Sequence, residues 1–385
     1  MKIRLLHISA GNLFGGVEDM LLTFAKYSYV CPDIQQDFAL CFDGCLSAEL
    51  HRIGSPVHLL GKVKTRFPWT VHQARRNLRQ WMNQSSYDVA ICHSAWPHAL
   101  FGPVVLRMRT PLVYWAHDIP SGKHWIEWWA KRTLPDLVLS NSHFTGRSTA
   151  RLFPNKPHTI YCPVEPLNFT QKDQLRSSLR QRWDTPQDAV VILLASRLET
   201  WKGHHLLLEG LKKLDNRKNW TCWIVAHVQR PAEDIYLKAL QSKLKETGMQ
   251  NRIRFIPNYS NSLLAASDIY CQPNTSPEPF GIAFIKALYA GVPVVTTNLG
   301  GLTEIIEPSC GLQVQPTAEE VADALQTLMD QPDLYQKFKR NGPVRAKQLC
   351  DPQAQLAKFQ TLMFGLMEKV KGPNANPKYQ SLSVS

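Results

Sequence analysis

The stretch AVVILLASRLETWKG, residues 189–203, places seven apolar residues directly before a short loop that carries two cations, Arg197 and Lys202. A continuous apolar run rich in β-branched residues is typical of a strand buried on both faces of a parallel sheet. Apolar residues at helical spacing follow from Leu206 to Leu214. The stretch therefore predicts a strand, a loop and a helix of an α/β fold.

The same alternation of short apolar runs and longer amphipathic stretches continues in both directions. In the N-terminal half the expected strands are residues 3–7, 38–42, 57–60, 89–93, 112–116 and 137–140. In the C-terminal half they are residues 189–195, 222–226, 253–256, 269–272, 292–296 and 312–314. This rhythm predicts parallel sheets that are covered by helices on both faces.

The pattern restarts near residue 185, after the proline-rich segment 162–166. We expect an N-terminal domain over residues 1–165 and a C-terminal domain over residues 166–350, as a length of 385 residues suggests. An amphipathic stretch predicts a closing helix over residues 351–371 that packs back on the N-terminal domain. The polar residues 372–385 are expected to form a disordered tail.

Composition indicates a globular protein, with 44% hydrophobic and 19% charged residues. No apolar run approaches the roughly 20 residues that span a bilayer, and the opening residues predict a first strand rather than a signal peptide. The nine cysteines are scattered without metal-binding spacing. We therefore expect a cytoplasmic protein in which most of the cysteines are small buried hydrophobic groups.

The formal net charge of +13 is unevenly distributed along the chain. Residues 51–86 contain no Asp or Glu, and they carry seven cations: Arg52, Lys62, Lys64, Arg66, Arg75, Arg76 and Arg79. Such an excess favours an anionic partner. No stacking motif accompanies it, so a nucleic acid is not the expected partner.

Tryptophans accompany these cations. Trp69 and Trp81 lie in the acid-free segment, where cations mixed with aromatic groups favour contact with an anionic membrane surface or an anionic acceptor. A plain solvated face is the alternative. Trp125, Trp128 and Trp129 recur at helical spacing further on. Such spacing usually marks a core, so we expect this stripe to be buried, with peripheral binding to the inner face of a membrane as the alternative.

Ligands of an open parallel sheet bind at the carboxyl ends of its strands, so the residues that follow each strand are the candidates for a site. Gly15 and Gly16 follow the first strand and lead into a helix, where backbone N–H groups can approach an oxyanion; a plain tight turn is the alternative. His93 and His117 each end or follow a strand, where a histidine either contacts substrate or is structural.

The C-terminal half offers more specific candidates. Arg197 and Lys202 are suited to bind a diphosphate beside a helix N-terminus; ordinary surface cations of a solvated loop are the alternative. Glu278 stands in a proline-rich loop, and the backbone N–H groups of the next helix start, from Phe280, Gly281 and Ile282, complement its carboxylate. Such a site combines an acceptor for sugar hydroxyls with donors for oxyanions. A further turn at Gly300 and Gly301 leads into another helix.

Taken together these segments resemble glycosyltransferase family 4, the retaining group 1 enzymes of the GT-B fold. The matching pieces, in order, are Gly15–Glu18, His117-Asp118, Arg197 with Lys202-Gly203, Glu278–Gly281, Gly291–Val295 and Gly300-Gly301 with Glu304. The resemblance implies two Rossmann-like doubly wound parallel-sheet domains that face each other across a cleft. It also implies a retaining, metal-independent enzyme without a cofactor, whose substrate is a nucleoside diphosphate sugar.

The sequence departs from the family pattern at Lys286, where the family has a second glutamate seven residues after Glu278. In the family that carboxylate accepts hydrogen bonds from the nucleotide ribose, whereas a lysine only donates. The departure leaves the nucleotide preference open. The alternative is that Lys286 points away and another group binds the ribose.

We expect a hexose-type sugar to be moved to a hydroxyl of a glycan or lipid-linked acceptor, in cell-surface polysaccharide or glycolipid synthesis. In the expected mechanism Arg197 and Lys202 stabilise the departing diphosphate, while His117 and Glu278 orient the donor sugar. Gly15, Gly16, Phe280, Gly281, Ile282, Lys286, Gly300 and Gly301 complete the expected donor site. The alternatives are a nucleotide-sugar epimerase of the same fold and a non-catalytic accessory or sugar-nucleotide-binding protein, which Lys286 alone favours.

Overall fold

The computed structural model describes residues 2–11, 13–214 and 219–371, and the expected tail at 372–385 lies outside them. The chain divides into two compact units. The first unit contains the residues up to Glu165 together with the chain from Cys350 onward, and the second contains Pro166–Leu349.

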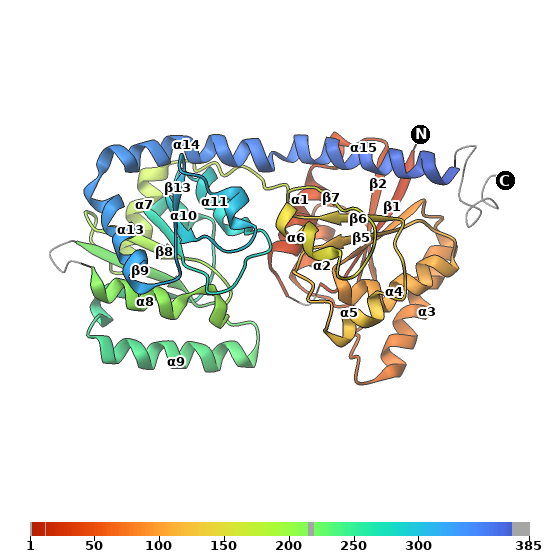
Figure 1. The fold of residues 1–385 in the computed structure, drawn as a ribbon, viewed down its shortest axis with the longest axis horizontal. Helices are drawn as coiled ribbons and strands as arrows, with labels where there is room; N and C mark the ends of the chain where they lie inside the picture. Colours follow the sequence, from red (N-terminus) through yellow and green to blue (C-terminus); the bar gives the residue numbers. More distant parts are fainter. Residues whose placement is uncertain (1, 12, 215–218, 372–385) are drawn as a thin grey trace. The chain divides into compact units, whose positions relative to one another are not determined.

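The first unit is built on a seven-stranded parallel sheet in the order β3-β2-β1-β4-β5-β6-β7 (Figure 1). Its strands are β1 (Ile3–Ser9), β2 (Ile34–Leu40), β3 (Val57–Leu59), β4 (Val89–His93), β5 (Leu112–Ala116), β6 (Leu137–Ser140) and β7 (His158–Thr159). Its helices are α1 (Gly16–Lys26), α2 (Cys45–Arg52), α3 (Pro68–Gln84), α4 (Ala95–Arg107), α5 (Trp125–Ala130), α6 (His143–Thr149) and α15 (Pro352–Lys371). The strand order reverses between β1 and β4, which is the switch point of a doubly wound sheet.

The second unit has a six-stranded parallel sheet in the order β10-β9-β8-β11-β12-β13. Its strands are β8 (Val190–Leu194), β9 (Trp220–Val225), β10 (Ile253–Ile256), β11 (Ile269–Gln272), β12 (Val294–Thr297) and β13 (Gly311–Val314). Its main helices are α7 (Lys172–Arg182), α8 (His204–Lys213), α9 (Pro231–Thr247), α11 (Ile282–Tyr289), α13 (Ala318–Asp330) and α14 (Pro332–Cys350), with short helices α10 (Ser262–Ala266) and α12 (Leu302–Ile305). The order reverses between β8 and β11, so both units confirm the predicted doubly wound α/β class.

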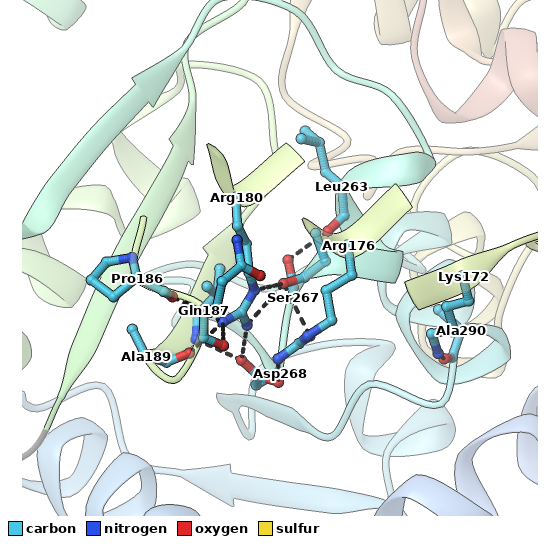
Figure 2. Close-up of polar contacts among 12 residues, drawn as sticks. Lys172, Arg176, Arg180, Pro186, Gln187, Ala189, Leu263, Ser267, Asp268 and Ala290 are labelled. Atoms are coloured by element: carbon cyan, nitrogen blue, oxygen red, sulfur yellow. Dashed lines mark hydrogen bonds and ion pairs between the residues drawn. The ribbon is translucent and has the colours of Figure 1, made fainter. Parts of the chain in front are cut away.

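Helix α7 is held by a buried arginine, although its sequence is polar. Arg180 is fully buried, and its guanidinium donates to the carboxylate of Asp268 at 2.6 Å and to the carbonyl of Ala189 at 2.8 Å (Figure 2). Arg176 donates to the other oxygen of Asp268 at 2.6 Å. Asp268 also accepts from the N–H of Val191 at 2.7 Å. The cluster therefore ties α7 to the amino ends of β8 and β11, at the edge opposite to the one where a ligand is expected.

Helix α15 belongs to the first unit. Phe359 of this helix packs edge-on against Phe24 of α1, with ring centroids 5.0 Å apart, and stacks on Trp115 of β5 at 5.8 Å. The thiol of Cys31 contacts the carbonyl of Leu356 at 3.3 Å. The end of the described chain thus completes the core of the first unit.

Eight of the nine cysteines are buried, which confirms their expected role as small hydrophobic groups, and Cys45 is exposed. Over residues 2–11, 13–214 and 219–371, none of the helices has the length and apolar character needed to cross a bilayer.

Candidate active site

Three loops meet at the carboxyl edge of the second sheet, because β8, β11 and β12 are neighbours there. Two of these loops form a buried ion pair. Nζ of Lys202, in the loop after β8, lies 2.6 Å from Oε2 of Glu278, in the loop after β11. Both side chains are about one-tenth exposed. Nδ2 of Asn274 donates to the same carboxylate oxygen at 2.9 Å. The structure therefore brings two of the four predicted catalytic residues into direct contact.

Glycines allow the loops to approach this closely. Gly203 has φ +80°, and a Cβ atom there would overlap the carbonyl oxygen of Pro273. Gly300 has φ +81°, and its Cβ would lie 2.6 Å from the backbone nitrogen of Glu278. The N–H of Gly301 donates to the carbonyl of Glu278 at 2.7 Å. Gly203 and Gly300 are therefore required by the backbone that surrounds Glu278.

A line of buried polar groups continues behind Glu278 along β11. Nε2 of Gln272 donates to Oδ1 of Asn274 at 2.8 Å, and the hydroxyl of Tyr270 lies 2.7 Å from Oε1 of Gln272. The carboxylate accepts from the amide nitrogen of Asn274, so each amide in the line has one orientation. Sequence reasoning missed these residues; the signal was a polar or hydroxyl-bearing side chain at every second position of an otherwise apolar strand.

Arg197 has a different carboxylate partner. Its guanidinium lies 3.0 Å from Oε1 of Glu199, and the same oxygen accepts from Arg230 at 2.9 Å. Arg230 precedes α9 and also pairs with the buried Glu233 at 2.7 Å. Sequence reasoning missed Arg230 as well. The two predicted diphosphate ligands thus bind two separate carboxylates.

The start of α11 also lies beside Glu278. Phe280 is buried, and Gly281 caps the helix with φ +106°, where a Cβ would lie 2.7 Å from Phe284. The helix begins at Ile282. Lys286 lies on this helix, with Nζ 5.9 Å from the ring centroid of Tyr259.

In the first unit, the predicted glycine turn forms the N-terminus of α1. Gly15 is the N-cap residue and Gly16 the first residue of the helix. The N–H of Gly15 donates to Oε2 of Glu18 at 3.0 Å. This N–H, which we expected to face an oxyanion, therefore binds a carboxylate of its own helix.

His117 lies at the end of a row of three buried histidines. Its Nε2 is 2.9 Å from Nδ1 of His93, whose Nε2 is 3.0 Å from Nδ1 of His7. Nε2 of His7 lies 3.1 Å from Oε1 of Gln36. Burial lowers the pKa of His7 to about 4 and that of His117 to about 3, and lowers the pKa of His93 well below its usual value. All three rings are therefore neutral near pH 7. His7 and Gln36 were not anticipated.

The tryptophan stripe of α5 lies on the surface, so the expectation that it is buried was wrong. Trp125, Trp128 and Trp129 are each about half exposed, and the guanidinium of Arg132 lies 4.1 Å from the ring centroid of Trp128. The inward side of this short helix is formed instead by Ile126, Glu127 and Ala130.

The acid-free segment contributes to the surface as well. Trp69 is 66% exposed, and six of the seven cations are exposed: Arg52, Lys62, Lys64, Arg66, Arg76 and Arg79. The seventh, Arg75, is half-buried and donates from Nε to the carbonyl of Leu100 in α4 at 2.6 Å. Helices α3 and α5 both pack against α4 (Figure 1).

Comparison with known proteins identifies the class. Residues 176–345 match the family described as glycosyl transferases group 1, and residues 28–166 match glycosyltransferase family 4. The human alpha-1,3/1,6-mannosyltransferase ALG2 is 27% identical over 250 residues, which are 60% of this chain and 59% of that protein. A GDP-mannose-dependent alpha-(1-6)-phosphatidylinositol monomannoside mannosyltransferase from Mycobacterium tuberculosis is 26% identical over 208 residues, 50% of this chain and 52% of that protein. The chain therefore spans less than two thirds of the length of these relatives.

Among solved structures, Anabaena HepE in complex with UDP-glucose is similar, with a TM-score of 0.83 and 23% identity over 94% of this chain and all of that one. This likeness concerns the fold. With both families matched along most of its length, the chain belongs to the group 1 glycosyltransferases of family 4, and its two doubly wound units are those of the GT-B fold.

Proposed function

We propose that the chain transfers a hexose-type sugar from a nucleoside diphosphate sugar to a hydroxyl of a glycan or lipid-linked acceptor, with retention of configuration. The observation that carries the proposal is the buried pair of Lys202 and Glu278 at the carboxyl edge of the second sheet, in a chain of this family. The GDP-mannose-dependent mannosyltransferase among the relatives, and the UDP-glucose complex of HepE, support a sugar nucleotide as donor. We assign the reaction to polysaccharide or glycolipid synthesis.

In the proposed reaction the bond between the anomeric carbon and the diphosphate breaks as the acceptor oxygen bonds to the same face of that carbon. The acceptor proton passes to a diphosphate oxygen. Lys202 and Arg197 stabilise the charge that grows on the leaving group, and His117 and Glu278 orient the sugar. Because these cations are paired with Glu278 and Glu199, donor binding must redirect part of their hydrogen bonding to the phosphates.

We also propose that no divalent metal takes part. In the proposed reaction Lys202 and Arg197 bind the diphosphate directly, and Arg230 shares the carboxylate of Glu199 with Arg197. Guanidinium and ammonium groups bind phosphate oxygens directly.

The test is transfer by the purified full chain with a panel of UDP-, GDP- and ADP-sugars, chosen first by thermal stabilisation. Arg197→Ala and Lys202→Ala should each lower kcat/KM by at least tenfold, since each removes a charge-assisted hydrogen bond to the leaving group, worth roughly 1.5–3 kcal/mol. Values within twofold of wild type for both would refute the assignment. Conversion of the donor to its epimer without acceptor would instead identify an epimerase.

A non-catalytic sugar-nucleotide-binding protein is the second candidate, and the observation that favours it is Lys286 in place of the family carboxylate. Thermal stabilisation by a nucleotide sugar, without transfer or hydrolysis, would establish it. Lys286→Glu then separates the two functions: an enzyme should change its preference among nucleotides, whereas a binding protein should gain affinity without turnover.

We propose, in addition, peripheral binding to an anionic membrane through the first unit. The basic aromatic surface is defined as the following exposed rings and cations, which lie on or just before α3 and on or just after α5: Trp69, Trp125, Trp128, Trp129, Arg66, Arg76, Arg79 and Arg132. Tryptophan is suited to the membrane interface, and each cation near an anionic surface contributes about 1 kcal/mol. Such binding would bring the enzyme to a lipid-linked acceptor.

A further inference from the structure

Four polar side chains form a staircase across the first sheet. They come from adjacent strands: Gln36 from β2, His7 from β1, His93 from β4, and His117 just after β5. Gln36 is in register with Leu5, His7 with Ile91, and His93 with Trp115. Each step therefore advances two residues toward the carboxyl edge. Because side chains alternate with period two, all four lie on one face of the sheet.

The hydrogen bonds along the staircase all run in one direction. Oε1 of Gln36 only accepts, so the proton of His7 is on Nε2, and Nδ1 of His7 accepts from Nε2 of His93. Nδ1 of His93 must in turn accept from Nε2 of His117. A neutral imidazole has one N–H, so Nδ1 of His117 has a lone pair and accepts hydrogen bonds.

Aromatic side chains hold the rings in place. His7 stacks on Phe38 with centroids 5.0 Å apart, and Trp115 stacks on His93 at 5.6 Å and on His117 at 5.4 Å. Phe359 of α15 lies over His7 at 6.4 Å. Rings packed in this way do not turn to exchange their two nitrogens without disturbing the core.

We propose that Gln36, His7 and His93 are positioning residues that fix His117 with its proton on Nε2, so that Nδ1 accepts a hydrogen bond from a hydroxyl of the sugar. The inference rests on the proposed function, in which His117 orients the donor sugar. The staircase is not a proton relay, because its inner end is a neutral amide that cannot take up a proton. Its role is to present an acceptor to the substrate rather than a donor.

The experiment is a long-range ¹⁵N–¹H correlation spectrum of the full chain labelled in its histidines, with His117 assigned from the signals lost in His117→Asn. In the wild-type chain at pH 7, Nε2 of His117 should carry the proton and Nδ1 should be unprotonated. Gln36→Met keeps the volume and removes the acceptor, so both tautomers of His117 should become populated. Gln35→Met is the matched control, since the neighbouring Gln35 is exposed and outside the staircase.

The activity of the same variants tests whether the tautomer of His117 matters for transfer of the sugar. Gln36→Met should lower kcat/KM for the donor by about threefold to tenfold, the equivalent of one neutral hydrogen bond, whereas Gln35→Met should match wild type. A wild-type His117 with its proton on Nδ1 would overturn the proposal, and so would a mixed tautomer in Gln36→Met with unchanged kcat/KM. A wild-type chain that transfers no sugar would refute the proposed function instead, while the spectrum would still test the staircase.

Discussion

The ammonium group of Lys202 lies 2.6 Å from the carboxylate of Glu278, and this pair joins the loop after β8 to the loop after β11. Removal of either charge leaves the other buried without a counter-ion, a change that destabilises proteins by roughly 3–5 kcal/mol. The pair therefore supports the second unit as well as the proposed chemistry.

We expect Lys202→Met and Glu278→Gln each to lower the free energy of unfolding strongly, and the double variant to lose less than the sum of the two. Chemical denaturation of the four proteins of this cycle measures the coupling, which should be on the order of 1–3 kcal/mol. Lys213→Met is a control, because Lys213 makes a 2.6 Å ion pair with Glu319 that is largely exposed. It should change stability little, and strictly additive effects at Lys202 and Glu278 would contradict the prediction.

Alanine substitution at Gly203 or Gly300 should destabilise the chain more than the backbone conformation alone explains. Gly54 has a similar φ of +75°, and a Cβ added there would meet no atom within 4 Å, so Gly54→Ala reports the conformational penalty, about 1–2 kcal/mol. Gly203→Ala and Gly300→Ala add a clash with Pro273 and Glu278. Equal losses in Tm for all three variants would show that the close approach of the loops is unimportant.

Transfer should persist after treatment with EDTA, because side-chain cations are proposed to bind the diphosphate directly. Initial rates before and after chelation, and after addition of magnesium or manganese, decide this. A rate abolished by EDTA and restored by either metal would require a different mechanism.

The sequence was most informative where a strand is buried on both faces. The run at 189–203 correctly located β8 and the following loop, since a short, continuous apolar run rich in β-branched residues is typical of a strand buried on both faces. β7 was missed because two residues, His158 and Thr159, carry no periodicity. Contacts between distant residues, such as the pairing of Arg180 with Asp268 or of His93 with His7, were not predictable, because they depend on which strands become neighbours. The stripe at Trp125 was misjudged because spacing identifies one side of a helix without saying whether that side is buried.

Vesicle binding should depend on the basic aromatic surface and on salt. Replacement of Trp128 and Trp129 by Ser should lower co-sedimentation with anionic vesicles at low ionic strength, and added salt should weaken the wild type. Ile235→Ser is the control, because Ile235 is 71% exposed on the second unit. Equal binding of wild type to neutral and anionic vesicles, or to neither, would end the proposal.

Stability should fall as the pH drops from about 6.5 toward 5. The buried histidines have pKa values below the usual 6.5, about 4 for His7 and about 3 for His117. The unfolded chain therefore takes up protons in this window while the folded chain does not, and each such histidine contributes a slope of up to about 1.4 kcal/mol per pH unit. Denaturation at several pH values should show that the free energy of unfolding depends less steeply on pH in His7→Phe than in wild type. A stability independent of pH across this window would contradict the prediction, because the native chain would then take up as many protons as the unfolded chain.

The packing of Phe359 against Phe24 and Trp115 has a consequence for biosynthesis. The first unit needs a helix that is encoded after the whole of residues 166–349, whereas the second unit is continuous in sequence. Translation proceeds at about 5–20 residues per second. Helix α15 is therefore synthesised on the order of ten seconds or more after the sheet of the first unit. The second unit can complete its core during that interval, so the order of folding on the ribosome is expected to be the reverse of the order of synthesis.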